Sequence, residues 1–457
     1  MSTRLLMVLG AGLGLSACMV GPEPVSPRMD VPEAFSTQLS EDRDIAQTEI
    51  AWWAALNDEQ LSELMVAVRA NNLDINVARA NLKRLYALET AARSDLFPSL
   101  DAFVESGLSV DLSEGDGSET STSLGGQFAW DLDIAGGNKR ALQAARSRLD
   151  AAKWTEEDVI RLATLEAGRQ FIELRRTNAR LAMLDTSLEL QQRTLDIVQA
   201  RFKVGLSPAL DVDRAASDLA QSRAQRHQLI SSQRQAEFAL SLLAGAPPER
   251  TSDSVSMSDV AVVPNFAALP DKGVPADLLR NRPDIRVAEA NLLAATAEIG
   301  VQQADLYPSL TLPGQIQTGV GLSGDIVSDA ALNLGAVLDI PLFDAGRRRA
   351  EVEAQEYATQ SALLNWQFAV LNALNEVEGA LVRIESLDAQ LLELQNSEAS
   401  SESAYRQLDA LYREGLSSFI DVLDAQRTLI SRREDLIEAE ADQATAIVEL
   451  YAYLAVS

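Results

Sequence analysis

Four segments of the chain alternate between apolar and polar or small side chains at successive positions. They cover residues 100–112, 124–134, 310–322 and 332–342, and their apolar side chains fall on even-numbered positions. An alternation with period two predicts β-strands that have one apolar and one polar face. A stretch rich in Gly, Ser and Asp separates the first two segments, and a similar stretch separates the last two, which predicts two hairpins.

The alternating segments have the length of strands that cross a membrane. Each spans about ten residues or more, as a tilted strand in a bilayer requires. The polar face, with Asp101, Asp131, Asp133 and Asp339, would then look into a barrel. A half-buried hairpin on a soluble core gives the same pattern, but hardly any other segment is strand-like. Four strands cannot close a barrel, so other subunits must complete it, and the sequence allows a dimer or a trimer.

Long helical segments flank the predicted hairpins. No Pro occurs between residues 138 and 203, and Gly168 is the only Gly there, which predicts a helix of roughly 100 Å at ~1.5 Å per residue. Apolar residues recur at intervals of seven along it, which is typical of coiled coils, although a solid bundle core would carry the same stripe. Shorter helices are expected at about 72–97, 208–245, 282–306 and 418–455.

One phrase occurs twice, as VGLSPALDV at residues 204–212 and as EGLSSFIDV at residues 414–422. The same offset of 210 residues relates DINVARANL at 74–82 to DIRVAEANL at 284–292. These matches predict an internal two-fold repeat.

Each repeated phrase is predicted to form the tight turn of a helical hairpin. Gly205 and Gly415 interrupt the helical periodicity, and Ser207 and Ser417 are placed to cap the returning helices. The expected organisation begins with a signal peptide at 1–17 and an N-terminal anchor and equatorial segment at 18–71. The first repeat, at 72–245, has a β-hairpin at about 98–135 and a helical tip near 205. A linker and equatorial segment at 246–281 leads to the second repeat at 282–457, which has a β-hairpin at about 308–343 and a tip near 415.

The N-terminal segment is typical of an export signal. Arg4 precedes an apolar run from Leu5 to Leu15, which is shorter than the ~20 residues that span a bilayer. The run ends in LSAC, which resembles a bacterial lipobox, so Cys18 would carry N-acyl and S-diacylglycerol groups as the first mature residue. An ordinary signal peptide with a chance Cys is the alternative. The residue after Cys18 is Met19 and not Asp, which resembles the pattern of lipoproteins that are sorted to the outer membrane.

Composition excludes several classes of function. The chain of 457 residues has one Cys and one His, which argues against disulfides, metal clusters and His-based catalysis. It has no recognisable nucleophile–base pair or phosphate loop, so we expect no catalytic residue, no metal site and no cofactor beyond the lipid on Cys18. The net charge of -28 makes nucleic acid a poor partner.

Several motifs resemble the TolC-like family of outer-membrane efflux proteins, especially its lipoprotein branch serving resistance–nodulation–division pumps. They are the lipobox, RPDIRVAEANL at 282–292, LYPSL at 306–310, PLFDAGRRRA at 341–350 and the paired turns, and the resemblance covers nearly the whole chain. It implies a mainly α fold with a small β part. It also implies a homotrimer in the cell outer membrane, lipid-anchored and extending into the periplasm. Four transmembrane strands per chain would form a twelve-stranded β-barrel above an α-helical coiled-coil barrel.

The resemblance further implies a passive exit duct for drugs or other small solutes, fed by an inner-membrane pump through a periplasmic adaptor. The adaptor would contact the hairpin tips at Gly205, Leu206, Ser207, Gly415, Leu416 and Ser417. A periplasmic gate would comprise Ile420, Asp421, Asp424 and Arg427. Arg side chains would bridge carboxylates that converge there. Taken alone, Asp424 and Arg427 also fit an ordinary exposed i,i+3 pair.

Two other functions fit parts of the sequence. A duct for type I protein secretion has the same architecture, but the lipobox favours the small-molecule branch. A structural coiled-coil lipoprotein that tethers the envelope would have no use for the alternating hairpins. The acidic excess fits either a tunnel wall that favours cations or a solubilising surface.

Overall fold

The structure is a computed structural model that describes residues 19–37, 44–46, 52–56, 58–111, 117–248, 260–266, 268–270, 275, 281–320 and 326–455. The predicted signal segment and Cys18 lie outside these residues. The chain divides into two compact units. The first comprises Met1–Met29, Ala80–Thr155 and Asp284–Ala369, and the second comprises Asp30–Arg79, Glu156–Pro283 and Val370–Ser457.

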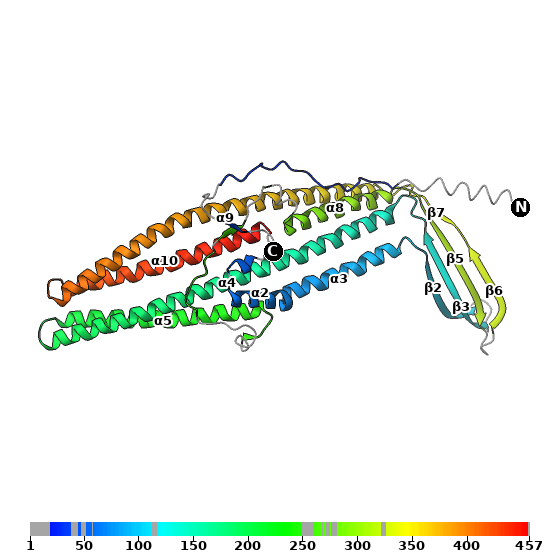
Figure 1. The fold of residues 1–457 in the computed structure, drawn as a ribbon. Coiled ribbons are helices and arrows are strands. Elements are labelled where there is room, and N and C mark those ends of the chain that lie inside the picture. Colours follow the sequence, from blue (N-terminus) through cyan, green and yellow to red (C-terminus); the bar gives the residue numbers. More distant parts are fainter. Residues whose placement is uncertain are drawn as a thin grey trace. The chain divides into compact units, whose positions relative to one another are not determined.

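Helices form most of the described chain, as Figure 1 shows. The predicted long helix is confirmed by α4 (Gly137–Lys203), and α9 (Arg347–Arg413) has the same length of 67 residues. The four shorter helices that the sequence predicts are also present, as α3 (Leu73–Ser94), α5 (Ala209–Leu243), α8 (Pro283–Ala304) and α10 (Phe419–Tyr453). None of the helices in the described ranges combines the length and apolar content that a membrane span needs.

The first unit contains the larger sheet. Its main path runs β2 (Ser99–Asp111), β3 (Gly117–Asp131), β5 (Ser309–Val320) and β6 (Ile326–Leu334), and all neighbours are antiparallel. The register places Asp101, Gln127, Gln315 and Asn333 in one polar row across these strands. Leu100, Phe128, Gly314 and Leu334 form the adjacent row. The predicted separation into a polar and an apolar face therefore extends across the whole sheet.

Several details of the predicted strands are wrong. β3 and β6 begin earlier than predicted, at Gly117 and Ile326. The fourth alternating segment is interrupted at Gly335, whose amide donates to the Pro313 carbonyl at 3.0 Å, so that β7 (Val337–Asp339) forms a separate short strand beside β5. Asp133 does not lie on a strand. It has a φ of +44°, and its carboxylate accepts the amides of Asn138 and Lys139 at the start of α4. Those amides lack helical partners, which is why an acidic side chain stabilises this position.

Segments that are distant in sequence pack together in the core of the second unit. The short helices η1 (Trp52–Leu56) and α2 (Glu59–Asn71) lie there with α4 and α10, and β1 (Asp44–Ala46) pairs with β4 (Ala268–Pro270). Gly168 of α4 is needed for this packing, because a Cβ there would lie 2.5 Å from Cη2 of Trp52 and 3.0 Å from Cγ1 of Val448. The rings of Phe266 and Tyr451 are 5.9 Å apart.

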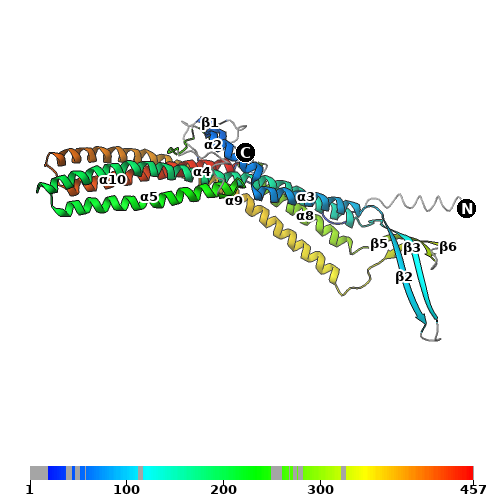
Figure 2. The ribbon, with the colours of Figure 1, turned by 90° about the horizontal axis from the view of Figure 1, so that it is seen from below.

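The second unit also contains two helical hairpins, one formed by α5 and the part of α4 from Glu156 onward, the other by α10 and the part of α9 from Val370 onward. In Figures 1 and 2 their turns lie at the same end and the hairpins run side by side. This end holds most of the residues that the sequence singles out.

Candidate functional site

Both helical hairpins turn through a left-handed glycine. Gly205 follows α4 with a φ of +77°, and Gly415 follows α9 with a φ of +79°. Each glycine amide donates to a carbonyl three residues back, and the next amide donates to a carbonyl five residues back, over 2.8 to 2.9 Å. This pair of hydrogen bonds defines a Schellman motif. Glycine adopts the positive φ of the turn without the strain that a Cβ atom would cause. Leu206 and Leu416 follow, and they are 68% and 71% exposed.

The prediction that Ser207 and Ser417 cap the returning helices is wrong by one residue. Pro208 is the N-cap of α5 and makes no side-chain capping bond. Ser418 is the N-cap of α10, and it forms a capping box with Asp421, in which each side chain accepts the other residue's backbone amide. Each Schellman turn includes the leucine after the glycine. The residue with the β-region backbone of an N-cap therefore follows one position later than predicted, at Pro208 and Ser418.

The ends of the two hairpins share one core, which we call the tip cluster. α4 and α5 contribute Leu195, Val198, Ala215 and Leu219, and α9 and α10 contribute Tyr405, Tyr412, Phe419, Val422, Leu423 and Leu429. Tyr412 links the two turns directly. Its carbonyl accepts a bond of 2.9 Å from Arg201, whose guanidinium lies 4.6 Å from the Tyr412 ring centroid, and its hydroxyl is 3.5 Å from that of Ser207. The first hairpin is therefore fastened to the second at the tip.

The four predicted gate residues lie on the first turns of α10. Ile420 is 43% exposed, and Asp424 and Arg427 are also exposed. Asp421 belongs to the capping box, and hydrogen bonds from Ser418 lower the pKa of its carboxyl. A carboxylate at the start of a helix is further favoured by the helix dipole.

Arg427 pairs with a residue that sequence analysis missed. Its guanidinium forms a two-pronged ion pair with Asp218 of α5, with Nε donating to Oδ2 at 2.9 Å and Nη2 donating to Oδ1. The Asp218 side chain is only 8% exposed, whereas that of Arg427 is 57% exposed. In place of the alternative intrahelical pair of Asp424 and Arg427, the structure has a bridge between the two hairpins. A sequence signal existed, because Asp218 interrupts the buried stripe between Ala215 and Leu219.

A buried amide lies next to this ion pair in α10. Gln426 is 2% exposed, and neither its side-chain oxygen nor its nitrogen has a hydrogen-bond partner within the described residues. A buried polar group without a partner costs about 1–3 kcal/mol. The apolar packing of the tip cluster is therefore accompanied by a buried polar residue that weakens it.

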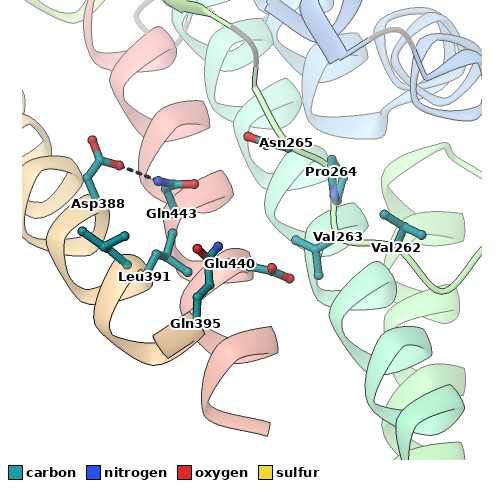
Figure 3. A pocket seen from close by; sticks show the side chains of 10 residues that line it. Val262, Val263, Pro264, Asn265, Asp388, Leu391, Gln395, Glu440 and Gln443 are labelled. Carbon is teal, nitrogen blue, oxygen red and sulfur yellow. Dashed lines mark hydrogen bonds between the residues drawn. The ribbon is translucent and has the colours of Figure 1, made fainter. Parts of the chain in front are cut away.

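A separate cavity of about 590 Å³ lies between the linker and the helices α9 and α10 (Figure 3). Val262, Val263, Pro264 and Asn265 line one side, and Asp388, Leu391, Leu392, Gln395, Glu440 and Gln443 line the other. The Gln443 amide donates to Asp388 at 2.5 Å. Burial raises the pKa of Glu440, which lies on the same wall.

Comparison with known proteins identifies the family. The model of the outer membrane efflux protein family matches residues 64–246 and 274–456. The chain belongs to the outer membrane efflux protein family. It is 30% identical to nodulation protein T of Rhizobium leguminosarum bv. trifolii over 96% of this chain and 94% of that protein. It is 28% identical to the pyoverdine export outer membrane protein OpmQ of Pseudomonas aeruginosa over 99% of this chain and 96% of that protein.

The solved outer-membrane channel OprN has the same fold. It matches with a TM-score of 0.86 and 28% sequence identity, over 96% of this chain and 99% of OprN. The mainly helical architecture with a small sheet is therefore that of outer membrane efflux channels. Among the described residues of this efflux protein, no group of three or more His, Cys, Asp or Glu side chains could hold a metal ion.

In this outer membrane efflux protein, the predicted tip and gate residues come together at the turns of the hairpins. Lipidation of Cys18 remains a prediction, since that residue lies outside the described ranges. Sequence analysis missed Asp218 on α5, which bonds the predicted gate residue Arg427, and Gln426 on α10, which is buried beside it.

Proposed function

We propose that this efflux protein is the outer-membrane channel of a tripartite efflux system, and that three copies form a passive exit duct across the outer membrane and the periplasm. The observation that carries the proposal is the exposed apolar face of the sheet. Leu100, Val104 and Leu334 are 78%, 71% and 76% exposed on even-numbered positions. An apolar face of this size, opposite a polar one, fits strands that separate lipid from water.

A sheet of this kind needs partners. β2 and β6 lie at the two ends of the strand order, and unpaired strand edges are not tolerated in hydrocarbon. Three chains that each contribute four long strands would close a twelve-stranded barrel. The polar row from Asp101 to Asn333 would then line a water-filled lumen.

The hairpin tips are the proposed contact for a periplasmic adaptor, which would join the duct to an inner-membrane resistance–nodulation–division pump. Leu206 and Leu416 support this role, because both are large apolar side chains that stay exposed at the turns. Gly205 and Gly415 beside them leave the backbone open to a partner helix, since a Cβ added at either glycine would meet no atom within 4 Å.

The gate is proposed to lie just beyond the second turn. In a trimer, three copies of Ile420, Asp421, Asp424 and Arg427 would face the axis, and the Asp218–Arg427 bridge would hold α10 against α5 in the closed state. Opening would require the helices to separate and the bridge to break. A guanidinium that bonds both carboxylate oxygens is suited to holding the closed state, because the paired hydrogen bonds fix the relative orientation of the two side chains.

Two further parts of the proposal concern the chain's organisation. Cys18 would carry the N-acyl and S-diacylglycerol groups and anchor the mature chain in the outer membrane. The two repeats, 72–245 and 282–457, would be related by a pseudo-two-fold relation in which α4, α5 and α3 correspond to α9, α10 and α8.

Two measurements on the purified protein test the duct. Native mass spectrometry in detergent should give three times the mass of the mature chain, and planar bilayers should show discrete conductance steps. A matched pair of variants controls for insertion: Val104→Asp places a charge on the face proposed for lipid and should abolish the steps, whereas Glu105→Asp changes the opposite face and should retain them. A monomer in detergent that gives no conductance would refute the proposal.

A further inference from the structure

A site outside the tips surrounds a buried arginine in the first unit. Arg140 of α4 is 1% exposed. Arginine is rarely buried to this extent unless its donors are paired. All of its principal partners belong to the segment that follows Cys18 or to its own helix.

Arg140 holds the backbone of two residues close to Cys18. Its Nε donates to the Val20 carbonyl at 3.0 Å, and its Nη2 donates to the Gly21 carbonyl at 2.9 Å. Its Nη1 donates to Gln143 at 2.8 Å, and Glu23 lies 3.6 Å from Nη2. The planar fork of arginine is suited to this arrangement, since its donors are fixed relative to one another.

Glycines make room for the segment on both sides. A Cβ on Gly300 of α8 would lie 2.7 Å from Cγ of Arg140, and a Cβ on Gly21 would lie 2.4 Å from Cα of Gly300. A Cβ on Gly136 would lie 2.9 Å from Cα of Met19. Such distances are well below van der Waals contact, so only glycine allows the three backbones to approach this closely.

The segment is also bonded to the junction between the sheet and α4. The Val20 amide donates to the carbonyl of Ala135 at 3.1 Å. Ala135 lies between the end of β3 at Asp131 and the start of α4 at Gly137. Three consecutive residues, Met19 to Gly21, are thus packed or hydrogen-bonded on several sides.

We propose that Gly136, Arg140 and Gly300, which we call the Arg140 clamp, form a binding site for the residues Met19–Gly21 and so fix the position of the lipid anchor. The inference rests on the proposed lipidation of Cys18. One peptide unit separates Cys18 from Met19, so the acylated residue stays within ~4 Å of a clamped Cα atom. The acyl chains then enter the bilayer beside the β3–α4 junction, at the base of the proposed membrane strands.

Without the clamp the anchor would still be attached but no longer positioned. No residue from 22 to 34 is buried, and Phe35 is the next buried residue. An extended segment from residue 18 to residue 34 could reach roughly 55 Å at ~3.3 Å per residue. Clamping therefore converts a long tether into a fixed attachment, which raises the effective concentration of the acyl chains at one place on the bilayer.

Arg140→Met tests the clamp, because methionine retains an apolar chain in the buried site and removes the donors. Amide exchange at residues 19–21 should become at least tenfold faster in this variant. Arg148→Met is the matched control, since Arg148 lies on the same helix with a side chain that is 52% exposed. Gly300→Ala provides a second route, because it displaces the Arg140 chain while every donor is kept. Exchange in both clamp variants at the rate of the control, in protein that remains folded, would refute the clamp.

Spin labels report the position of the segment separately from the chemistry of the anchor. One label goes on a cysteine introduced at Val25, which is 73% exposed, and the other goes on a cysteine at Asp150 in the same unit. Cys18 is the only native Cys, so an acylated chain takes two labels. We expect one narrow distance, which broadens in Arg140→Met and not in Arg148→Met. A third label on Cys18 would refute the lipid anchor, while the exchange data would still decide whether the clamp holds the segment.

Discussion

Breaking the Asp218–Arg427 bridge should loosen the hairpin tips and open the proposed gate. Arg427→Ala leaves the carboxylate of Asp218 without its guanidinium in a position where the side chain is 8% exposed. Asp218→Ala leaves only an arginine that is 57% exposed and can be solvated. The structure therefore predicts that Arg427→Ala destabilises the protein more than Asp218→Ala does.

The size of the effect follows from the geometry. A hydrogen bond to a charged group contributes about 1.5–3 kcal/mol. Because Arg427 is exposed, solvent screens the ion pair and lowers its contribution toward the ~0–1 kcal/mol of a surface ion pair. We therefore expect a coupling free energy of about 1–2 kcal/mol between the two residues, obtained from the free energies of unfolding of both single variants and the double variant.

The same variants should change conductance in planar bilayers. If the bridge holds the closed state, a loss of about 1–2 kcal/mol shifts the ratio of open to closed channels by about 5–30-fold. Asp218→Ala and Arg427→Ala should raise the open fraction to a similar extent, and the double variant should add little. Asp424→Ala is the control for stability, because it removes a charge from the proposed gate without breaking the bridge. It should increase conductance and change the free energy of unfolding by less than about 0.5 kcal/mol.

Two results would refute this reasoning. Additive effects of the two single variants on stability would show that the bridge is not a functional pair. Unchanged conductance in all of these variants would remove the gate from this part of α10, even if the bridge proved stabilising.

Three further predictions concern the described helices. Ser418→Ala should lower the free energy of unfolding by about 1 kcal/mol through loss of the cap, and Ser417→Ala should change it little; equal effects in chemical denaturation would contradict the observed capping box. Gly168→Ala should destabilise by about 1–3 kcal/mol through its clash with Trp52, whereas Gly379→Ala, with no atom within 4 Å, should be neutral or stabilising in thermal unfolding. Because burial raises the pKa of Glu440, the folded state binds its proton more tightly and stability from this group falls as pH rises. Glu440→Gln should therefore raise the melting temperature at pH 7 and have no such effect near pH 4.

The sequence predicts the helices and strands well because each has a strong local signal. Along α4 the signal is the absence of Pro, and along β2 and β3 it is the alternation of apolar and polar side chains. Both signals can be read from neighbouring residues, without knowledge of tertiary contacts. The errors arise where tertiary contacts decide. Asp133 fits the alternation, yet it leaves the strand because the free amides at the start of α4 attract its carboxylate.

The candidate site is less accessible from sequence for the same reason. Arg427 has an acidic residue three positions before it, so local spacing favours an intrahelical pair with Asp424. Its actual partner is 209 residues away on α5. A pairing over this distance follows only from the way the two hairpins pack. The one local hint is an acidic residue on a buried stripe of α5, between the apolar residues Ala215 and Leu219.

The composition of α10 indicates where the helical part of the protein is easiest to open. Toward its C-terminus the helix buries a mostly apolar set, in which the hydroxyl of Tyr451 is the one side-chain polar group: Ala439, Ala441, Ala444, Ala446, Ile447, Val448, Leu450, Tyr451 and Ala452. Toward the tip the buried set includes Gln426, and the neighbouring helix buries Asp218. Desolvating these polar groups opposes the hydrophobic stabilisation that the tip cluster provides. The free energy needed to separate the helices is therefore lower at the tips than near residue 450, which is where a duct closed by its periplasmic ends would need to yield.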